Sequence, residues 1–465
     1  MSDVLAILRD SLPGAVFREV SDSYLQEPRG TWHGQARAVL APGSTDEVAA
    51  IVRACAASAT PIIPYGGGTG LVGGQIAETG TPPVILSLER MTQIGPVDAI
   101  SGTVRVEAGA ILANIHAAAE AEDLIFPLTL GSQGSARIGG LLGTNAGGVN
   151  VIRYGNTRDL CLGLEAVLPD GTVFSGLSGL RKDNTGYDLR HLLIGSEGTL
   201  GVITGAVLRL FPQPAAYGAA IVAVESPAAA LELLRIAKAR AGASLSAFEL
   251  ISRVGVDFIE EVGPETRLPF EASPDWMCLI DLGAPEGADP QADLEAIFAE
   301  GFEAGLVQDG VIAQSEADRT DFWVLRETIP EANRRIGSIS SHDISLPIQR
   351  VAAFIDRAAG VVAGLGGFRI NCFGHLGDGN LHYNVFPMQG RDRKAHANEK
   401  PVIQRAVHDL VHEMGGSVSA EHGVGRLKVA DLERYGDPGK LAAMRAIKSA
   451  LDPKGIMNPG AVLRV

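Results

Sequence analysis

The chain has 465 residues, 46% hydrophobic and 20% charged, which is typical of a soluble globular protein with room for two domains. Its formal net charge of -15 argues against nucleic acid as a partner, because an acidic surface repels a polyphosphate backbone. The four cysteines lie far apart and form no Cys-x-x-Cys pair, which argues against a cysteine metal cluster and a disulfide framework.

The beginning of the chain lacks the basic start and apolar run of a signal peptide. No apolar segment reaches the length of about 20 residues that a transmembrane helix needs. Together with the separated cysteines, these features predict a cytoplasmic protein without a transmembrane segment.

The first half alternates helix-like and strand-like segments around clusters of glycine. Ser44 and Glu47 have the spacing of a capping box, which predicts a helix from there to about Ala59. Further strands are expected at 61–65, 84–88 and 104–107, and a further helix at 111–121.

The densest glycine run covers residues 64–74. Glycines allow successive backbone N–H groups to converge on an anion, so the run predicts a pyrophosphate site, with a tight surface turn as the alternative. Residues 68–73 also match the G-x-G-x-x-G dinucleotide fingerprint, but that fingerprint must open a crossover helix. Only about ten residues separate Gly73 from the next strand, too few for such a helix. We therefore reject an NAD-type Rossmann domain.

Two more clusters of Gly, Ser, Thr and Asn follow, at 131–148 and 195–201. Any one cluster is a weak signal. Three in one domain indicate a long, extended cofactor that backbone groups hold along its length.

Pro212 and Pro214 interrupt regular structure and predict a domain boundary. The segments beyond them have the β-α-β-β-α-β order of a ferredoxin-like domain. They are strands at 220–224, 247–250, 277–282 and 310–314, with helices at 227–241 and 291–304.

The pair Asp378-Gly379 favours a two-residue hairpin turn, which would place His375 directly opposite His382. Two imidazoles there could share a zinc ion, and Glu421 could complete the three protein ligands usual for a catalytic zinc. Asn384 shares that sheet face and is a candidate catalytic residue. The neighbouring His422 would then be free of the metal and could act as a general base. The alternative is that these histidines are hydrogen-bonded structural residues.

Arg326 is the first candidate to bind a carboxylate of a ligand, because guanidinium grips carboxylate bidentately. The alternative for Arg326 is a helix-surface ion pair with a nearby glutamate.

Residues 143–148 (Gly-Thr-Asn-Ala-Gly-Gly), 153–159 (Arg-Tyr-Gly-Asn-Thr-Arg-Asp) and 456–460 (Ile-Met-Asn-Pro-Gly) resemble the vanillyl-alcohol oxidase/p-cresol methylhydroxylase superfamily. Within it, they are most similar to the D-2-hydroxyacid dehydrogenase branch. The resemblance implies an α+β fold, with a two-part FAD-binding domain at 1–214 and a ferredoxin-like substrate domain with a metal site at 215–450. Residues 451–465 would return to the FAD domain.

The resemblance implies FAD with its pyrophosphate on the first glycine run. We expect it to be non-covalent, because that run holds no histidine or cysteine. The residues expected to contact FAD are Pro64, Gly66, Gly67, Gly68, Thr69, Gly70, Leu71, Gly73, Gly74, Gly131, Ser132, Gly140, Thr144, Asn145, Gly147, Gly148, Glu197, Gly198, Gly201, Ile203 and Asn458. The resemblance also places zinc, or another divalent metal, on His375, His382 and Glu421, with His422 as base.

The activity so implied is oxidation of a D-2-hydroxy acid, first D-2-hydroxyglutarate, with electrons passed to an electron-transfer flavoprotein or a quinone. A homodimer, and a peripheral place at the membrane through the acceptor, are further options. Pro330 and Ser341 depart from the family pattern, which often has a hydroxyl residue and a lysine there, so D-lactate, D-malate and glycolate stay open. The alternatives are an oxygen-using oxidase and a non-catalytic FAD subunit of a glycolate oxidase complex.

Overall fold

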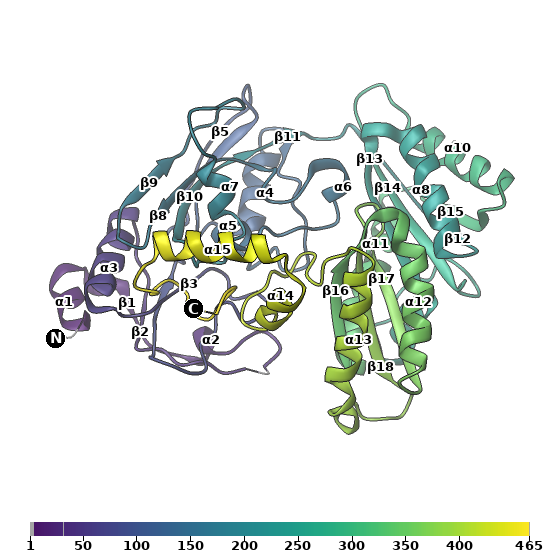
Figure 1. The fold of residues 1–465 in the computed structure, drawn as a ribbon. Helices are drawn as coiled ribbons and strands as arrows, with labels where there is room; N and C mark the ends of the chain where they lie inside the picture. The colour runs from purple at the N-terminus through teal and green to yellow at the C-terminus, as the bar shows by residue number, and fades with distance from the viewer. Residues whose placement is uncertain (1–3, 31, 465) are drawn as a thin grey trace. The chain divides into compact units, whose positions relative to one another are not determined.

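The computed structural model describes residues 4–30 and 32–464 (Figure 1). The chain divides into two compact units. Unit 1 comprises Met1–Gly148, Gly155–Gln213 and Glu421–Val465, and unit 2 comprises Val149–Tyr154 and Pro214–Ala420. The passage of the chain from unit 1 to unit 2 after Gln213 coincides with the domain boundary predicted at Pro212 and Pro214.

The predicted return of the chain to the first domain at 451 is wrong in position, because unit 1 resumes at Glu421. The cause is a set of backbone hydrogen bonds from Arg426 and Leu427 to the Val72 oxygen, at 2.9 and 3.1 Å. Residues 149–154 also depart from the prediction and belong to unit 2. There Arg153 donates to the Gly283 oxygen at 2.5 Å and to Ser246 Oγ at 2.9 Å.

Unit 1 contains a four-stranded sheet and a five-stranded antiparallel sheet. The first has the order β1-β2-β4-β3, in which β2, β4 and β3 run parallel: β1 (Phe17–Arg18), β2 (Ala38–Leu40), β4 (Val84–Ser87) and β3 (Ile62–Tyr65). The second has the order β5 (Ile94–Asp98), β6 (Thr103–Glu107), β10 (Val202–Arg209), β8 (Cys161–Val167) and β9 (Val173–Gly176). A small pair joins β7 (Leu124–Ile125) to β11 (Phe211–Pro212).

The helices of unit 1 are α1 (Val4–Ser11), α2 (Asp22–Leu25), α3 (Thr45–Ser58), α4 (Leu112–Glu120), α5 (Ile138–Thr144), α7 (Leu189–Leu193), α14 (Val429–Tyr435) and α15 (Pro438–Leu451). The predicted cap of α3 is confirmed, since Ser44 Oγ accepts from the Glu47 amide at 3.2 Å. No helix of the described structure lies between β3 and β4, which agrees with the rejection of a Rossmann crossover.

The ferredoxin-like order predicted for the second domain is confirmed in unit 2. Its first four strands lie in the order β15 (Val307–Ile312), β12 (Ala216–Val224), β14 (Trp276–Ala284) and β13 (Leu245–Ser252). The sheet continues through β17 (Phe368–His375), β18 (Asn380–Pro387) and β16 (Ser340–Ser345), and all its neighbours are antiparallel. This extension brings residues far apart in sequence onto one sheet.

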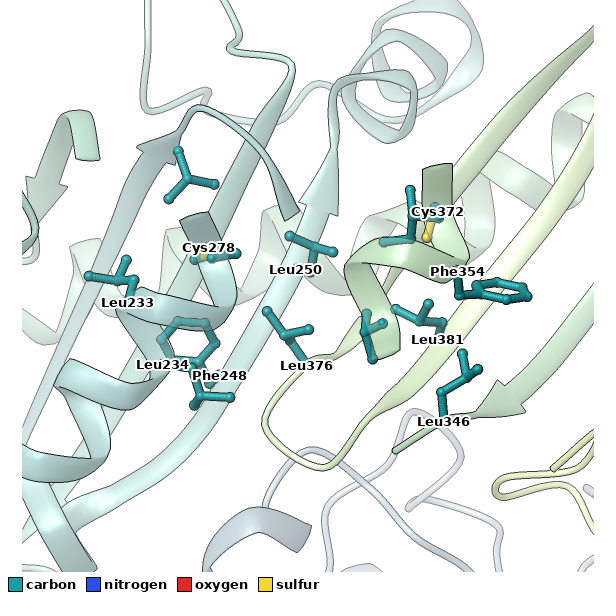
Figure 2. Packing of buried hydrophobic residues seen from close by; sticks show 14 of the residues in the cluster. Leu233, Leu234, Phe248, Leu250, Cys278, Leu346, Phe354, Cys372, Leu376 and Leu381 are labelled. Carbon is teal, nitrogen blue, oxygen red and sulfur yellow. The ribbon is translucent and has the colours of Figure 1, made fainter. Parts of the chain in front are cut away.

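Apolar side chains from both faces of this sheet form the two cores of unit 2. One core joins Phe248, Leu250 and Cys278 to residues of α8 and α12, as Figure 2 shows. The other includes residues of α9 and α11. The helices of unit 2 are α6 (Val151–Tyr154), α8 (Pro227–Ala241), α9 (Arg253–Val262), α10 (Pro290–Glu303), α11 (Glu316–Ile336), α12 (Val351–Ala363) and α13 (Glu399–Glu413).

The described helices include none with the length and hydropathy needed to cross a membrane.

Candidate functional site

The first predicted glycine run lines a cavity in unit 1 together with parts of the other two clusters. Among the described residues, none accepts a hydrogen bond from the backbone amides of residues 67–70. Successive N–H groups that point into a cavity form an anion-binding nest. The cavity wall therefore fits the pyrophosphate of a dinucleotide.

Close backbone packing explains why glycines stand in this wall. A Cβ at Gly67 would lie 2.3 Å from the Ser135 oxygen, and a Cβ at Gly66 would lie 3.2 Å from Gly140 Cα. Gly68 has a φ of +71° and would place a Cβ on the Tyr65 hydroxyl. The first and second clusters are therefore in contact, as a shared cofactor wall requires.

Fourteen of the residues expected to contact FAD lie in the cavity wall: Pro64, Gly66, Gly67, Gly68, Thr69, Gly70, Gly74, Gly140, Thr144, Glu197, Gly198, Gly201, Ile203 and Asn458. The other seven lie outside the wall of this cavity: Leu71, Gly73, Gly131, Ser132, Asn145, Gly147 and Gly148. Some of these have structural contacts. Asn145 ends α5 with a φ of +53°, and its Oδ1 accepts from the Arg158 amide at 2.9 Å.

The wall also contains residues for which no role is predicted from the sequence. Arg137 and Gln75 are examples: Arg137 donates to the Gly109 oxygen at 2.6 Å, and Gln75 donates to the Gly70 oxygen at 2.8 Å. Their nearness to the glycine clusters in sequence was the available signal.

The C-terminal segment supplies one side of the cavity. Asn458 donates from Nδ2 to the Gly74 oxygen at 3.0 Å and to the Glu197 oxygen at 2.8 Å. Arg426 donates to the Gly73 and Gly74 oxygens at 3.0 and 2.8 Å and to Asn458 Oδ1 at 2.8 Å. This network joins the first and third glycine clusters.

His422 lies in the wall of the same cavity. The backbone just after it is held by Glu197, whose two carboxylate oxygens accept from the Val424 and Gly425 amides, each at 2.7 Å. Burial raises the pKa of Glu197, and these amides oppose the rise. Glu421 lies against Gly147, where an added Cβ would be 2.8 Å from its Oε1.

The predicted register of the His375–His382 hairpin is wrong by two residues. His382 pairs with Phe373, because a turn covering residues 376–379 replaces the two-residue turn. A residue outside the hairpin stabilises the longer turn, since the Gly377 amide donates to the Phe248 oxygen at 3.0 Å. A two-residue shift keeps a strand's faces, so both histidines still share one face, with ring centroids 5.7 Å apart.

Glu249, on β13, is a site residue that the sequence analysis missed. It pairs with His375 across the sheet, and its Oε1 lies 2.6 Å from His375 Nδ1. Burial alone would raise the pKa of Glu249, but the charges of His375 and Arg326 hold it lowered to about 2. An ionised Glu249 accepts a hydrogen bond from Nδ1–H of His375, so Nε2 is the atom left to bind a cation.

Arg326 is held by the same glutamate. Its Nε and Nη2 each lie 2.8 Å from Glu249 Oε2, and its guanidinium covers the Phe373 ring at 4.8 Å. Arg326 is thus in a buried ion pair, unlike the surface pair that was the alternative. Among the described residues, no hydrogen bond or ion pair uses its Nη1.

Further polar groups share the sheet face of the two histidines. Asp343 pairs with His382, and Asn380 donates from Nδ2 to Asp343 Oδ1 at 3.1 Å. Asn384 is only 8% exposed, and no other described residue makes a hydrogen bond with its side chain. Asn384 therefore offers a buried amide to a ligand, as its predicted role requires.

Of the two positions that depart from the family pattern, Ser341 lies on this face. Ser341 is exposed and pairs with Asn384 across the sheet, and its Oγ lies 2.6 Å from Ser338 Oγ. Pro330 is exposed within α11, four residues beyond Arg326 and so on the same side of the helix.

Comparison with known proteins gives matches over both units. Residues 213–462 match the model described as FAD linked oxidases, C-terminal domain, and residues 36–176 match the FAD binding domain. The chain is 38% identical to "D-2-hydroxyglutarate dehydrogenase, mitochondrial" of Bos taurus, over 98% of this chain and 82% of that one. It is 36% identical to "D-2-hydroxyglutarate dehydrogenase" of Xanthomonas citri pv. viticola, over 92% of this chain and 89% of that one.

Solved structures agree in fold. The chain is similar to p-cresol methylhydroxylase with a TM-score of 0.76 and 17% identity, covering 99% of this chain and 96% of that one. It is similar to alkyldihydroxyacetonephosphate synthase with a TM-score of 0.72 and 16% identity, covering 99% and 84%. These likenesses confirm the predicted two-part FAD-binding fold.

Proposed function

This chain belongs to the FAD-linked oxidases, and from that premise we propose that it oxidises D-2-hydroxyglutarate to the 2-oxo acid with FAD and zinc. The observation that carries the proposal is the position of His422, the expected base, in the wall of the glycine-lined cavity. The relatives named D-2-hydroxyglutarate dehydrogenase support the oxidation of a D-2-hydroxy acid as the reaction class.

The cavity residues Gly66–Gly70, Gly140 and Asn458 would hold FAD without a covalent bond. The amides of residues 67–70 suit its pyrophosphate, and the first glycine run holds no histidine or cysteine for covalent attachment. When bound, FAD supplies the acceptor for the hydride that leaves C2 of the substrate.

His375, His382 and Glu421 would hold the divalent cation. The fit rests on the two imidazoles that share one face of the sheet and on Glu249, which fixes the tautomer of His375. Glu421 directly follows Ala420, whose amide donates to the Asp343 oxygen at 3.3 Å, and Asp343 pairs with His382. When bound, the cation supplies Lewis-acid chemistry that makes the C2 hydroxyl more acidic.

Three further residues would accept the substrate proton or bind the substrate. His422 would accept the hydroxyl proton, because histidine titrates in the useful range. Arg326 would bind the C1 carboxylate through Nη1, the atom that Glu249 does not use. Asn384 would orient the substrate with its unpaired side-chain amide.

The distal end of the substrate would lie near Pro330 and Ser341. A serine offers no charge to a second carboxylate, so D-lactate, D-malate and glycolate belong in every substrate panel. D-2-hydroxyglutarate is placed first because several relatives carry it in their names.

The acceptor would be an electron-transfer flavoprotein or a quinone, and the chain would work in the cytoplasm, at the membrane surface only through that acceptor. A homodimer is the assembly that we would test first. Several relatives are named mitochondrial, so cell fractionation is the test of location, and recovery with mitochondria would contradict a cytoplasmic place. Light scattering tests the assembly.

The decisive experiment uses the purified chain with its bound cofactors. Its visible spectrum should show flavin, and elemental analysis should show zinc. D-2-hydroxyglutarate should bleach the flavin under argon while the L-isomer does not. No bleaching by any D- or L-2-hydroxy acid would favour a non-catalytic subunit, whereas peroxide release in air would favour an oxidase.

A further inference from the structure

We propose that Glu197 is a positioning residue that holds the loop of His422 against the flavin cavity. This inference rests on the proposed role of His422 as the base. It reassigns Glu197, for which the family resemblance implies a contact with FAD. Each of its carboxylate oxygens is already engaged by a backbone amide of the loop.

The contact of Glu197 with the loop involves consecutive residues just after His422. Oε1 accepts from the Val424 amide and Oε2 from the Gly425 amide, each at 2.7 Å. A Cβ on Gly423, whose φ is +79°, would lie 2.8 Å from Oε1. The loop therefore lies directly on the carboxylate, and any other residue at 423 would push it away.

Glu197 is itself fixed in the cavity wall. Its amide donates to the Gly143 oxygen at 2.8 Å, and its carbonyl oxygen accepts from Asn458 Nδ2 at 2.8 Å. Its backbone has a φ of +51°, a left-handed conformation that a glutamate keeps only when its surroundings hold it. Glu197, a residue of the third glycine cluster, thus contacts the second cluster through its backbone and the loop that carries the base through its side chain.

The charges around Glu197 suit this role. Burial raises the pKa of Glu197, whereas the charges of Lys428 and Arg426, both within the same loop segment, oppose that rise. A carboxylate that accepts two amide hydrogens makes stronger bonds than a neutral amide would. Glu197→Gln keeps the size of the side chain but points an N–H at one loop amide, so that bond is lost.

The test compares Glu197→Gln with the matched variant Glu165→Gln. Glu165 also lies in unit 1 and has two side-chain partners, since its Oε1 accepts from Thr45 and Thr204. In the oxidised, FAD-loaded protein without substrate, Glu197→Gln should speed hydrogen exchange of the amides at 424 and 425 at least tenfold. Glu165→Gln should leave their exchange unchanged.

Kinetics provide the second measurement. Anaerobic flavin reduction should slow by about 10- to 100-fold in Glu197→Gln, while FAD affinity changes less than about threefold, as loss of one charged hydrogen bond predicts. In a His422→Ala background, the same substitution should cause no further slowing. Additive slowing, or a large loss of FAD affinity, would show that Glu197 acts on the flavin and would overturn the inference.

The outcomes separate this inference from the proposed function. Normal reduction with unchanged exchange would overturn the role of Glu197 alone. Faster exchange without flavin reduction by any hydroxy acid, in wild type as well, would overturn the proposed function and with it the catalytic meaning of Glu197. If Glu197→Gln fails to fold, Glu197→Asp keeps the charge but shortens the reach, and should show the same exchange and kinetic effects in weaker form.

Discussion

His375 Nδ1 lies 2.6 Å from Glu249 Oε1, and Glu249 is fully buried on the same sheet face that carries both histidines. Arg326 holds the other oxygen of this glutamate at 2.8 Å. The three side chains form one buried ionic chain, so the orientation of His375 depends on a residue of another strand and on a helix.

Substitution Glu249→Gln should weaken zinc binding by about 10- to 100-fold, because the partner that orients the ligating histidine is lost. It should also destabilise the protein by about 3–5 kcal/mol, since Arg326 is left buried without its counter-ion. Competition with a chromogenic chelator measures the first effect, and urea unfolding measures the second. The exposed pair Arg240–Glu300 supplies the control, Glu300→Gln, which should change neither. Unchanged zinc affinity in Glu249→Gln would contradict the metal site.

Substitution His422→Ala should slow flavin reduction by D-2-hydroxyglutarate by about 10²- to 10⁴-fold, the usual contribution of a general base. Flavin and zinc contents should stay as in wild type, because His422 is proposed to bind neither. Anaerobic stopped-flow spectroscopy gives the rate. The exposed His33, altered to alanine, is the control. Wild-type reduction by His422→Ala would remove this residue from the mechanism.

Substitution Ser341→Lys should shift selectivity towards the dicarboxylate substrate. A lysine on this exposed end of β16 would add a cation beside Asn384, and a hydrogen bond to a charged group contributes about 1.5–3 kcal/mol. The ratio of kcat/KM for D-2-hydroxyglutarate over D-lactate should therefore rise about tenfold or more. Gln349→Lys adds the same charge at another exposed position and should leave the ratio unchanged. An unchanged ratio in Ser341→Lys would place the distal end of the substrate elsewhere.

The buried thiols predict a loss of stability in alkaline solution. Burial raises the pKa of Cys55 to about 12, and the same cause raises the pKa of Cys161 to about 12. An unfolded thiol ionises near pH 8.5, so between about pH 8.5 and 12 only the unfolded state loses the proton. Stability is therefore complete below pH 8.5 and falls by up to about 1.4 kcal/mol per pH unit for each thiol above it.

Urea unfolding at several values of pH measures this slope. Cys55→Ala should make the slope shallower, even though it lowers stability at every pH by leaving a cavity. A slope equal to that of wild type would show that Cys55 ionises as readily in the folded protein as in the unfolded one.

Local patterns predicted much of each unit. Ser44 and Glu47 begin α3 as expected, and the hydrophobic segments gave the ferredoxin-like strand order. The glycine run at 64–74 lines a cavity because its chemistry depends on backbone freedom, which is readable from composition. Such features depend on residues close in sequence.

The failures concern contacts between distant residues. The Asp378-Gly379 pair predicted a two-residue turn, but a hydrogen bond from Gly377 to Phe248 sets the longer turn. Glu249 precedes His375 by 126 residues, and nothing in its own neighbourhood marks it as a partner. The prediction that both histidines share one sheet face holds despite the wrong register, because side chains on one face of a strand recur at every second residue.

The bridge between Ile62 and Met457 has a consequence for biosynthesis. Ile62 donates to the Ile456 oxygen and accepts from the Asn458 amide, each at 2.8 Å. The edge of strand β3, which is synthesised early, therefore gains these partners only when the C-terminal segment has been synthesised. A nascent chain cannot complete the nucleotide pocket before that segment leaves the ribosome. We therefore expect flavin to bind only after this segment has been made, and a variant lacking the residues from 458 onward to be synthesised with little bound cofactor.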